Sequence, residues 1–212
     1  MTFSDPAILM SCHVGVLALQ GAFAKHIEML RSLGAVGVEI REPVDLDGVD
    51  ALILPGGEST TISRMLVRWG LIEPIRSLID DQLPVFGTCA GLIHLADHLV
   101  HWDDMPRIGG LHLSVERNAY GRQIDSFEAA LEIEIHGAPE FQSAPFGGVF
   151  IRSPKILPES VTEELQVLCR FEGIPVLVRQ QNILGGSFHP ELSGDGRLHE
   201  WFLREMVKSA GS

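Results

Sequence analysis

The sequence predicts a single α/β domain in three layers, with a mostly parallel central sheet and added antiparallel strands. In the first hundred residues, short apolar runs alternate with segments whose apolar residues recur at helical spacing. This alternation is typical of a parallel sheet with right-handed helical crossovers on both faces. In the middle third, strand-like runs follow one another without helices, so antiparallel strands extend or flank that sheet. No linker-like stretch divides the 212 residues, which favours one domain.

The first half of the chain supplies the parallel part of the fold. Short apolar runs predict buried strands at Val14–Leu19, Val36–Ile40, Ala51–Leu54 and Pro84–Phe86. Apolar residues at helical spacing predict helices at Ala22–Leu33, Thr60–Trp69, Ile72–Asp80 and Leu92–Val100. Gly34 stands where a helix C-terminal cap is expected.

The second half supplies the added strands and a closing helix. β-rich runs predict strands at Leu111–Val115, Phe127–Ile135, Val149–Ile151, Leu165–Phe171, Val176–Arg179 and Ile183–Phe188. Glu172-Gly173 is a candidate hairpin turn, and Leu198–Val207 is an amphipathic closing helix. We expect residues 1–13 to be an N-terminal extension and residues 14–209 to form the domain.

Composition excludes several classes of protein. The chain is 45% hydrophobic and 21% charged, which is typical of a globular protein and not of a disordered one. Its formal net charge of −12 disfavours nucleic-acid binding. No apolar run of about 18 residues predicts a membrane span, and the N-terminus lacks the basic start of a signal peptide. Three widely spaced cysteines suit a reduced, cytoplasmic protein.

A candidate nucleophile lies in the turn Gly87-Thr88-Cys89-Ala90-Gly91, between a predicted strand and a predicted helix. This pattern is the cysteine form of the G-x-S-x-G nucleophile elbow. The turn raises Cys89 above the sheet edge at a helix N-terminus, where the helix dipole favours thiolate. The Ala90 amide would face an oxyanion that forms beside the sulfur. The alternative is a buried core cysteine in a glycine-rich turn.

His189 is the candidate base because it follows an apolar strand, and catalytic groups gather at the C-terminal ends of parallel strands. Glu191 lies two residues further on, so in near-extended chain it would point the same way and hold the imidazole. The alternative is a surface His-Pro-Glu turn. A second glycine-rich turn, Pro55-Gly56-Gly57-Glu58-Ser59, could cradle an anion or complete an oxyanion hole opposite Ala90, or be a plain turn.

Other polar clusters carry weaker signals. His94, His98 and His101 share one side of the predicted helix, but the apolar residues lie opposite, so we expect a solvent-facing stripe and no metal. The loop 117–123 contains two arginines and is suited to recognising a carboxylate or a partner, or is a solvated loop. Arg152 would pair with a substrate carboxylate or with a surface acid. No dinucleotide or P-loop motif occurs, and we expect no cofactor.

Six stretches together resemble the class I (Cys-His-Glu) glutamine amidotransferases, and most closely the glutaminase subunit of pyridoxal 5′-phosphate synthase. They are VGVLALQGAFAKH (14–26), LILPGGESTTISR (52–64), PVFGTCAGLI (84–93), VERNAYGRQIDSFE (115–128), VFIRSP (149–154) and GGSFHPEL (185–192). The resemblance implies a flavodoxin-like class I amidotransferase fold. The chain departs from the family pattern at Lys25, where an acidic residue is usual, and at Ser153, where alanine is usual.

The resemblance also implies an activity and a site. Cys89, His189 and Glu191 would form the triad, and an oxyanion hole would be made by Gly56, Gly57 and Ala90. The L-glutamine site would comprise Gly57, Glu58, Ser59, Arg117, Ile151 and Arg152. The family hydrolyses glutamine to glutamate and ammonia through a γ-glutamyl thioester. The class is a hydrolase, and we also associate lyase chemistry with the family.

The partners implied are L-glutamine and a separate (β/α)8 synthase subunit in a large hetero-oligomer. That subunit would use the ammonia to make pyridoxal 5′-phosphate. Neither nucleic acid nor membrane is expected as a partner. Alternatives are a glutaminase for another synthase, a non-catalytic docking scaffold, and a cysteine hydrolase or chaperone with a similar elbow. The stretches around Arg117 and Arg152 argue against the first, and the intact triad residues argue against the second.

Overall fold

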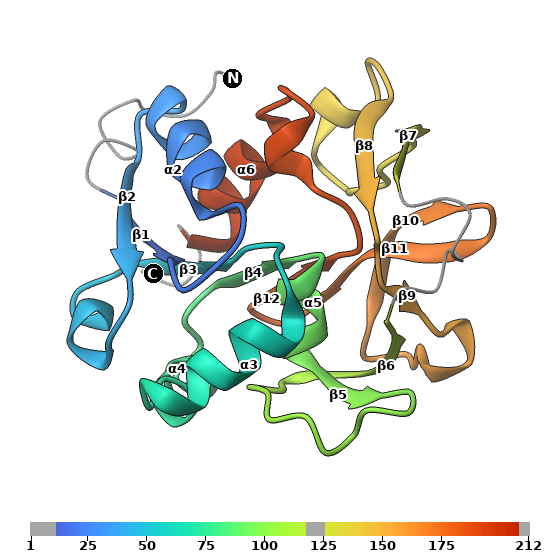
Figure 1. Ribbon diagram of the computed structural model, residues 1–212. Coiled ribbons are helices and arrows are strands. Elements are labelled where there is room, and N and C mark those ends of the chain that lie inside the picture. The colour runs from blue at the N-terminus through green and yellow to red at the C-terminus, as the bar shows by residue number, and fades with distance from the viewer. Residues whose placement is uncertain (1–11, 118–125, 208–212) are drawn as a thin grey trace.

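A seven-stranded sheet lies at the centre of the computed structural model, which describes residues 12–117 and 126–207 (Figure 1). Its strand order is β10-β11-β12-β4-β3-β1-β2. The five strands from β12 to β2 pair in parallel, and β11 and β10 continue the sheet with antiparallel pairing. The strands of this sheet are β1 (His13–Leu17), β2 (Val36–Ile40), β3 (Ala51–Leu54), β4 (Val85–Thr88), β10 (Gln166–Phe171), β11 (Ile174–Gln180) and β12 (Ile183–Gly186).

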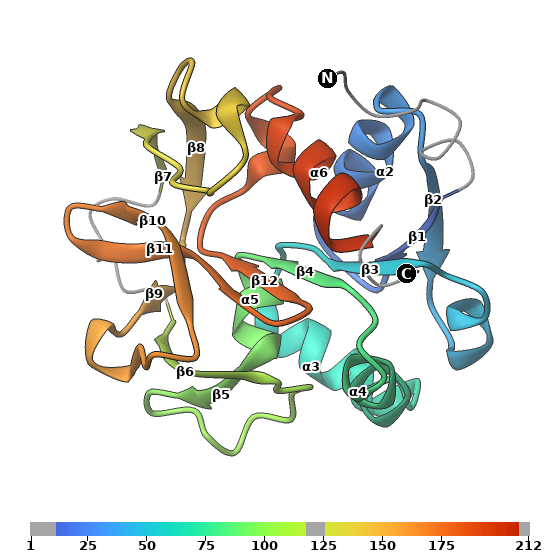
Figure 2. The same cartoon turned by 180° about the vertical axis from the view of Figure 1, so that it is seen from behind.

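Helices cover both faces of this sheet. The two opposite views place α2 and α6 on one face and α3, α4 and α5 on the other (Figures 1 and 2). Their bounds are α2 (Phe23–Ser32), α3 (Ser59–Arg68), α4 (Ile72–Asp80), α5 (Ala90–Leu95) and α6 (Arg197–Trp201), which a π-helical turn continues at Phe202–Val207. Each face has its own cluster of buried apolar side chains, with Leu66 and Ile75 in one and Leu30 and Phe202 in the other. The predicted three layers are therefore confirmed.

Two smaller sheets flank the central one. One has the order β5-β6-β9 and the other pairs β7 with β8. Their strands are β5 (Ala96–Leu99), β6 (Leu111–Glu116), β9 (Lys155–Ile156), β7 (Ser126–Leu131) and β8 (Phe146–Ile151). Short 3-10 turns lie at Pro43–Leu46, Pro139–Phe141, Pro158–Ser160 and Pro190–Leu192. The His189 amide donates to the Val149 carbonyl at 2.8 Å, which ties the chain after β12 to β8.

Three predicted elements have the predicted bounds, nine are shifted by one to three residues at one or both ends, and three differ more. The strands at Val36–Ile40 and Ala51–Leu54 and the helix at Ile72–Asp80 match. The helix expected at Leu92–Val100 is wrong, because the chain leaves the helix after Leu95 and its next four residues pair in parallel with β6. Tertiary pairing here overrides the helical spacing of the apolar residues.

The other differences concern the middle and the end of the chain. The strand expected at Phe127–Ile135 ends at Leu131, and beyond it Ile133 makes only an isolated bridge to Cys169. The closing helix begins one residue earlier than expected and changes to π-helical hydrogen bonding at Phe202. The hairpin at Glu172-Gly173 is confirmed, with both residues at positive φ. No helix in the described part of the chain is long and apolar enough to cross a bilayer.

Candidate active site

The C-terminal ends of four neighbouring parallel strands bring the candidate residues together. β12, β4, β3 and β1 are adjacent in the sheet. They lead respectively to His189, to Cys89, to the Gly56-Gly57 turn and to the Gln20-Gly21 loop. Ligands of open α/β sheets bind at this edge. Residues that are far apart in the chain therefore share one location.

Cys89 occupies a strained turn between β4 and α5. Its φ is 50° and its ψ is −104°, which is an unusual conformation for a residue with a side chain. The Cys89 amide donates to the Gly186 carbonyl at 2.8 Å. Glycine is required at Gly91, because a Cβ there would lie 1.8 Å from the Leu54 carbonyl oxygen. The strand pairing and the close approach of Gly91 to β3 thus hold the turn in place, as the elbow pattern predicts.

His189 and Glu191 contact each other beside Cys89. The Nδ1 of His189 lies 2.8 Å from the Oε1 of Glu191, and both side chains are buried. The contact is the predicted one, although Glu191 lies in a 3-10 turn and not in extended chain. Burial works to lower the pKa of His189, but its interactions with Cys89 and Glu191 raise this pKa to about 10.

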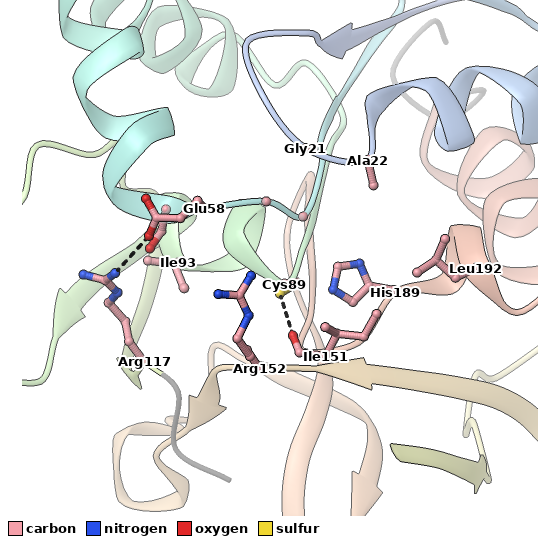
Figure 3. A pocket seen from close by; sticks show the side chains of 13 residues that line it. Gly21, Ala22, Glu58, Cys89, Ile93, Arg117, Ile151, Arg152, His189 and Leu192 are labelled. Carbon is pink, nitrogen blue, oxygen red and sulfur yellow. Dashed lines mark hydrogen bonds and ion pairs between the residues drawn. The ribbon is translucent and has the colours of Figure 1, made fainter. Parts of the chain in front are cut away.

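The carboxyl of Glu191 is held in its ionised form. Burial alone would raise its pKa, but His26 and His189 more than offset this, so the pKa is lowered. An ionised Glu191 beside a protonated imidazole can orient the ring and stabilise its positive charge. The Sγ of Cys89 lies 3.8 Å from the Ile151 carbonyl oxygen on the other side (Figure 3).

The Gly56-Gly57 turn packs directly against this group. A Cβ at Gly56 would lie 2.3 Å from the Cε1 of His189, and one at Gly57 would lie 2.5 Å from the Oε1 of Gln20. The Gly56 carbonyl accepts from the Ala22 amide at 2.9 Å, and the Glu58 amide donates to Gln20 at 2.7 Å. Because a trans peptide opposes its C=O and N–H, the Gly57 amide points away from Ala22. The loop after β1 therefore sets the orientation of this turn.

Charged side chains lie at the other end of the site. The Oε2 of Glu58 accepts from the Thr61 amide at 2.8 Å and so caps α3. The Nη2 of Arg117 lies 3.8 Å from the Oε1 of Glu58, and its guanidinium lies 4.6 Å from the centre of the Trp102 ring. Figure 3 shows Arg152 between Arg117 and Cys89, with Glu58 on the same side.

A cavity of about 230 Å3 joins these groups. The six residues of the predicted glutamine site line it, namely Gly57, Glu58, Ser59, Arg117, Ile151 and Arg152, together with Gly56, Cys89 and His189. Ala90 and Glu191 are not among its lining residues, and Glu191 lies behind His189. Sequence reasoning missed Gly21, Ala22, Ile93 and Leu192, which also line it. The sequence marks Gln20-Gly21 as the loop that ends the first strand, in a region expected to contact the synthase, and not as part of the cavity.

The histidine stripe is not as predicted. His94 is 1% exposed, and its Nε2 lies 3.1 Å from the Ser59 carbonyl oxygen, so the expectation of a solvent-facing stripe is wrong for this residue. His98 lies on β5 and His101 follows it, because the helix ends at Leu95. Among the described residues, no group of three or more His, Cys, Asp or Glu side chains could hold a metal ion. The predicted arginine loop beyond Arg117 lies outside the described residues.

Comparison with known proteins assigns the family. The chain matches the SNO glutamine amidotransferase family over residues 16–208. The chain belongs to this family. Membership confirms the predicted enzyme class, glutamine amidotransferase, whereas the association with lyase chemistry was wrong for this chain.

Individual relatives support the same assignment. The pyridoxal 5′-phosphate synthase subunit PdxT of Moorella thermoacetica is 49% identical over 191 residues, which are 90% of this chain and 97% of the relative. A crystal structure of a glutamine amidotransferase has a TM-score of 0.83 at 46% identity, and the match covers 94% of this chain and 99% of that one. PurLQS from Thermotoga maritima is 15% identical with a TM-score of 0.63, over 94% of this chain and 96% of that one, and shares the fold.

Proposed function

We propose that this chain hydrolyses L-glutamine to L-glutamate and ammonia, and that a separate synthase subunit uses the ammonia to make pyridoxal 5′-phosphate. The observation that carries the proposal is the contact of Cys89, His189 and Glu191 at one end of a cavity whose other end holds Arg117, Arg152 and Glu58. The similarity to PdxT subunits supports the choice of pathway.

The charged end of the cavity suits the α-amino acid part of glutamine. The guanidinium groups of Arg117 and Arg152 would pair with the α-carboxylate. The pKa of Glu58 is lowered: burial works against this, but hydrogen bonds from Thr61 dominate. Glu58 is therefore ionised and would accept the α-ammonium group. This arrangement leaves the side-chain carboxamide directed toward Cys89.

The reaction then proceeds in two steps. The Cys89 thiolate attacks the carboxamide carbon, and the backbone amides of Gly57 and Ala90 would stabilise the oxyanion. His189 gives its proton to the leaving nitrogen, so ammonia departs and a γ-glutamyl thioester remains. Water then attacks the thioester, His189 accepts a proton from it, and glutamate is released while the Cys89 thiolate is restored. Glu191 would keep the His189 ring oriented throughout.

The test is ammonia and glutamate release from glutamine, measured with and without a pyridoxal 5′-phosphate synthase (β/α)8 subunit. Cys89→Ala and His189→Ala should lower kcat by about 10⁶, and Glu191→Gln by about 10⁴, as for other nucleophile–base–acid triads. Cys169→Ala is the matched control, because this buried cysteine lies on β10, away from the cavity. Full activity in Cys89→Ala would rule out the proposed nucleophile.

Two further measurements separate binding from chemistry and one synthase from another. Arg117→Ala should raise KM for glutamine by about 10- to 100-fold, because a charge-assisted hydrogen bond to the carboxylate is lost. An unchanged KM would remove Arg117 from the site. Formation of pyridoxal 5′-phosphate with glutamine as nitrogen source should require this chain. If adding this chain does not increase pyridoxal 5′-phosphate formation by the synthase, the proposed pathway is wrong while the glutaminase activity stands.

The remaining features of the proposal concern the chain as a whole. We propose residues 14–209 as the glutaminase domain and residues 1–13 as an extension, with a large hetero-oligomer as the working form in the cytoplasm. The described part of β1 begins at His13, which pairs with Val36. Lys25 carries an ion pair to Glu28 at 2.7 Å on the exposed face of α2, near the loop that orients the Gly56 carbonyl.

A further inference from the structure

Two buried histidines lie behind the candidate triad and have no part in the reaction described above. His26 comes from α2 and His199 from α6, and both are 0% exposed. The Nε2 of His26 lies 3.3 Å from the Oε2 of Glu191 and 3.2 Å from the Oγ1 of Thr88, the residue before the nucleophile. The Nδ1 of His26 lies 2.9 Å from the Nε2 of His199. An unbroken row of polar atoms thus runs from His199 through His26 and Glu191 to His189.

The surroundings of both histidines favour the neutral ring. Burial lowers the pKa of His26, and although Glu191 opposes this, the lowering prevails. Burial, together with the neighbouring His26, lowers the pKa of His199 to about 3. Each ring therefore carries one proton, and only one proton lies between the two facing nitrogens. The question is which ring donates it.

The neighbouring acceptors and donors determine which of the two proton arrangements is favoured. If His26 donated from Nδ1, its Nε2 lone pair would face the Glu191 carboxylate, and His199 would carry its proton on Nδ1. That Nδ1 is buried and has no hydrogen-bond partner among the described residues. A buried N–H without an acceptor is costly. If His199 donates from Nε2 instead, the His26 proton lies on Nε2 and points at Glu191 and Thr88. This second arrangement avoids both penalties.

The Oε2 atom of Glu191 needs such a donor. Its Oε1 already contacts His189, whereas Oε2 is buried and has no hydrogen-bond partner of good geometry among the described residues; the Nε2 of His26 faces it at 3.3 Å. A buried carboxylate oxygen without a donor favours protonation of the carboxyl and lets the group rotate. Protonation or rotation of Glu191 would misalign His189, which depends on it for orientation.

We propose that His26, itself oriented by His199, is a positioning residue that holds Glu191 ionised and aligned for His189. The proposal rests on the glutaminase function proposed above. His26 touches neither the cavity nor the reacting atoms, so its effect passes through Glu191. The groups that face it are Glu191 and His189 from the segment around the 3-10 turn, His199 from α6 and Thr88 from β4.

The test compares substitutions that differ in one hydrogen bond. His26→Gln places an amide nitrogen near the position of Nε2 and should keep most of kcat. His26→Leu has similar size and no donor, and it should lower kcat by about 10- to 100-fold with KM unchanged, which is the effect of one lost charge-assisted hydrogen bond. In the pH profile of kcat/KM, the acid limb of His26→Leu should move to higher pH than that of the wild type, because Glu191 is protonated more readily without the His26 N–H beside it.

Each result separates positioning from packing. If both variants keep wild-type kcat, or if both lose it equally with the acid limb unmoved, the proposal fails. His112→Gln, a substitution of an exposed histidine, is the surface control. Circular dichroism checks folding. If His26→Leu does not fold, His26→Asn takes its place, since its shorter amide reaches toward His199 and not toward Glu191.

A measurement without turnover distinguishes failure of this proposal from failure of the proposed function. The ¹⁵N chemical shifts of the wild-type His26 ring should show a neutral ring protonated on Nε2 between pH 6 and 9. A charged ring, or one protonated on Nδ1, would overturn the proposal even if glutamine is hydrolysed. Absence of glutamine hydrolysis by the wild type with its synthase would instead refute the function and leave the tautomer result standing.

Discussion

Replacing Gly56 by alanine tests the close packing between the glycine turn and the candidate base. The backbone of Gly56 lies outside the positive-φ region, so alanine adds no backbone strain there. Its new methyl group would lie 2.3 Å from the Cε1 of His189, 2.8 Å from Nδ1 and 3.2 Å from the Cβ of Cys89. The atoms nearest to the new methyl group therefore all belong to the candidate base and the candidate nucleophile.

The size of the effect follows from the overlap. Carbon atoms in contact are separated by about 3.5 Å or more, so the His189 ring must retreat by about 1.2 Å or the turn must move by the same amount. The ring has little room, because Nδ1 is already 2.8 Å from Glu191. A displacement of about 1 Å in a catalytic group costs about 100-fold in rate. Overpacking also costs about 1–3 kcal/mol of stability.

The assay is glutamine hydrolysis in the presence of the synthase subunit, with urea unfolding in parallel. We expect kcat of Gly56→Ala to fall by about 100-fold while the protein stays folded at 25 °C. Gly147→Ala is the matched control, because its methyl group would meet only the Cβ of Ser193, at an ordinary 3.6 Å. If Gly56→Ala keeps half or more of wild-type kcat, the packing argument for this turn is refuted.

Three further predictions concern thiols, pH and loop anchoring. Burial, and then Asp50, raise the pKa of Cys12 to about 11, and burial, and then nearby glutamates, raise the pKa of Cys169 to about 12. Iodoacetamide at neutral pH should therefore label only Cys89. Detection of label on Cys12 or Cys169 by mass spectrometry would contradict this prediction. The pKa of His189 is raised from 6.5 to about 10, so its contribution to stability is complete below pH 6.5 and disappears as the pH rises through 10. Urea unfolding of wild type and His189→Gln should therefore converge over this range, and a constant difference would exclude the contribution. Arg197 donates hydrogen bonds to three carbonyls of the loop 140–145 and to Asp195. Arg197→Ala should therefore lower the free energy of unfolding by about 1.5–3 kcal/mol in urea unfolding. A loss under about 0.5 kcal/mol would show that these hydrogen bonds do not stabilise the fold.

Local sequence patterns predicted the structure correctly where a single feature, such as an apolar run, determines the bounds of an element. The strands at Val36–Ile40 and Ala51–Leu54 are short apolar runs in the parallel part of the sheet, the first at its edge and the second fully buried, and their bounds follow from the runs themselves. The meeting of Cys89 and His189 also followed, because Cys89 directly follows one parallel strand and His189 lies three residues beyond the end of its neighbour. Parallel strands place their C-terminal ends on one edge, so sequence distance does not matter there.

The sequence-based predictions failed where residues distant in the chain determine the local structure. Ala96 and Leu99 continue the helical spacing of the preceding residues, yet β6 recruits this segment as a strand. No local sequence pattern in this segment indicates its pairing with β6. His26 and His199 likewise look like ordinary polar positions on amphipathic helices. Their proposed role depends on two helices distant in the chain, which place His26 beside Glu191 and His199 beside His26.

The register between β4 and β12 has a consequence for the synthesis of the protein. Gly186 lies opposite Thr88 in this parallel pair, so the strand that precedes the candidate nucleophile pairs with residues about a hundred positions later in the chain. A ribosome adds residues from the N-terminus at about 5–20 per second, so Cys89 exists for several seconds before His189 is made. During that interval Cys89 has neither the candidate base nor the strand whose Gly186 carbonyl accepts from its amide. Cys89 in the emerging polypeptide is thus without the surroundings of the candidate site, which form only when β12 is inserted into the sheet.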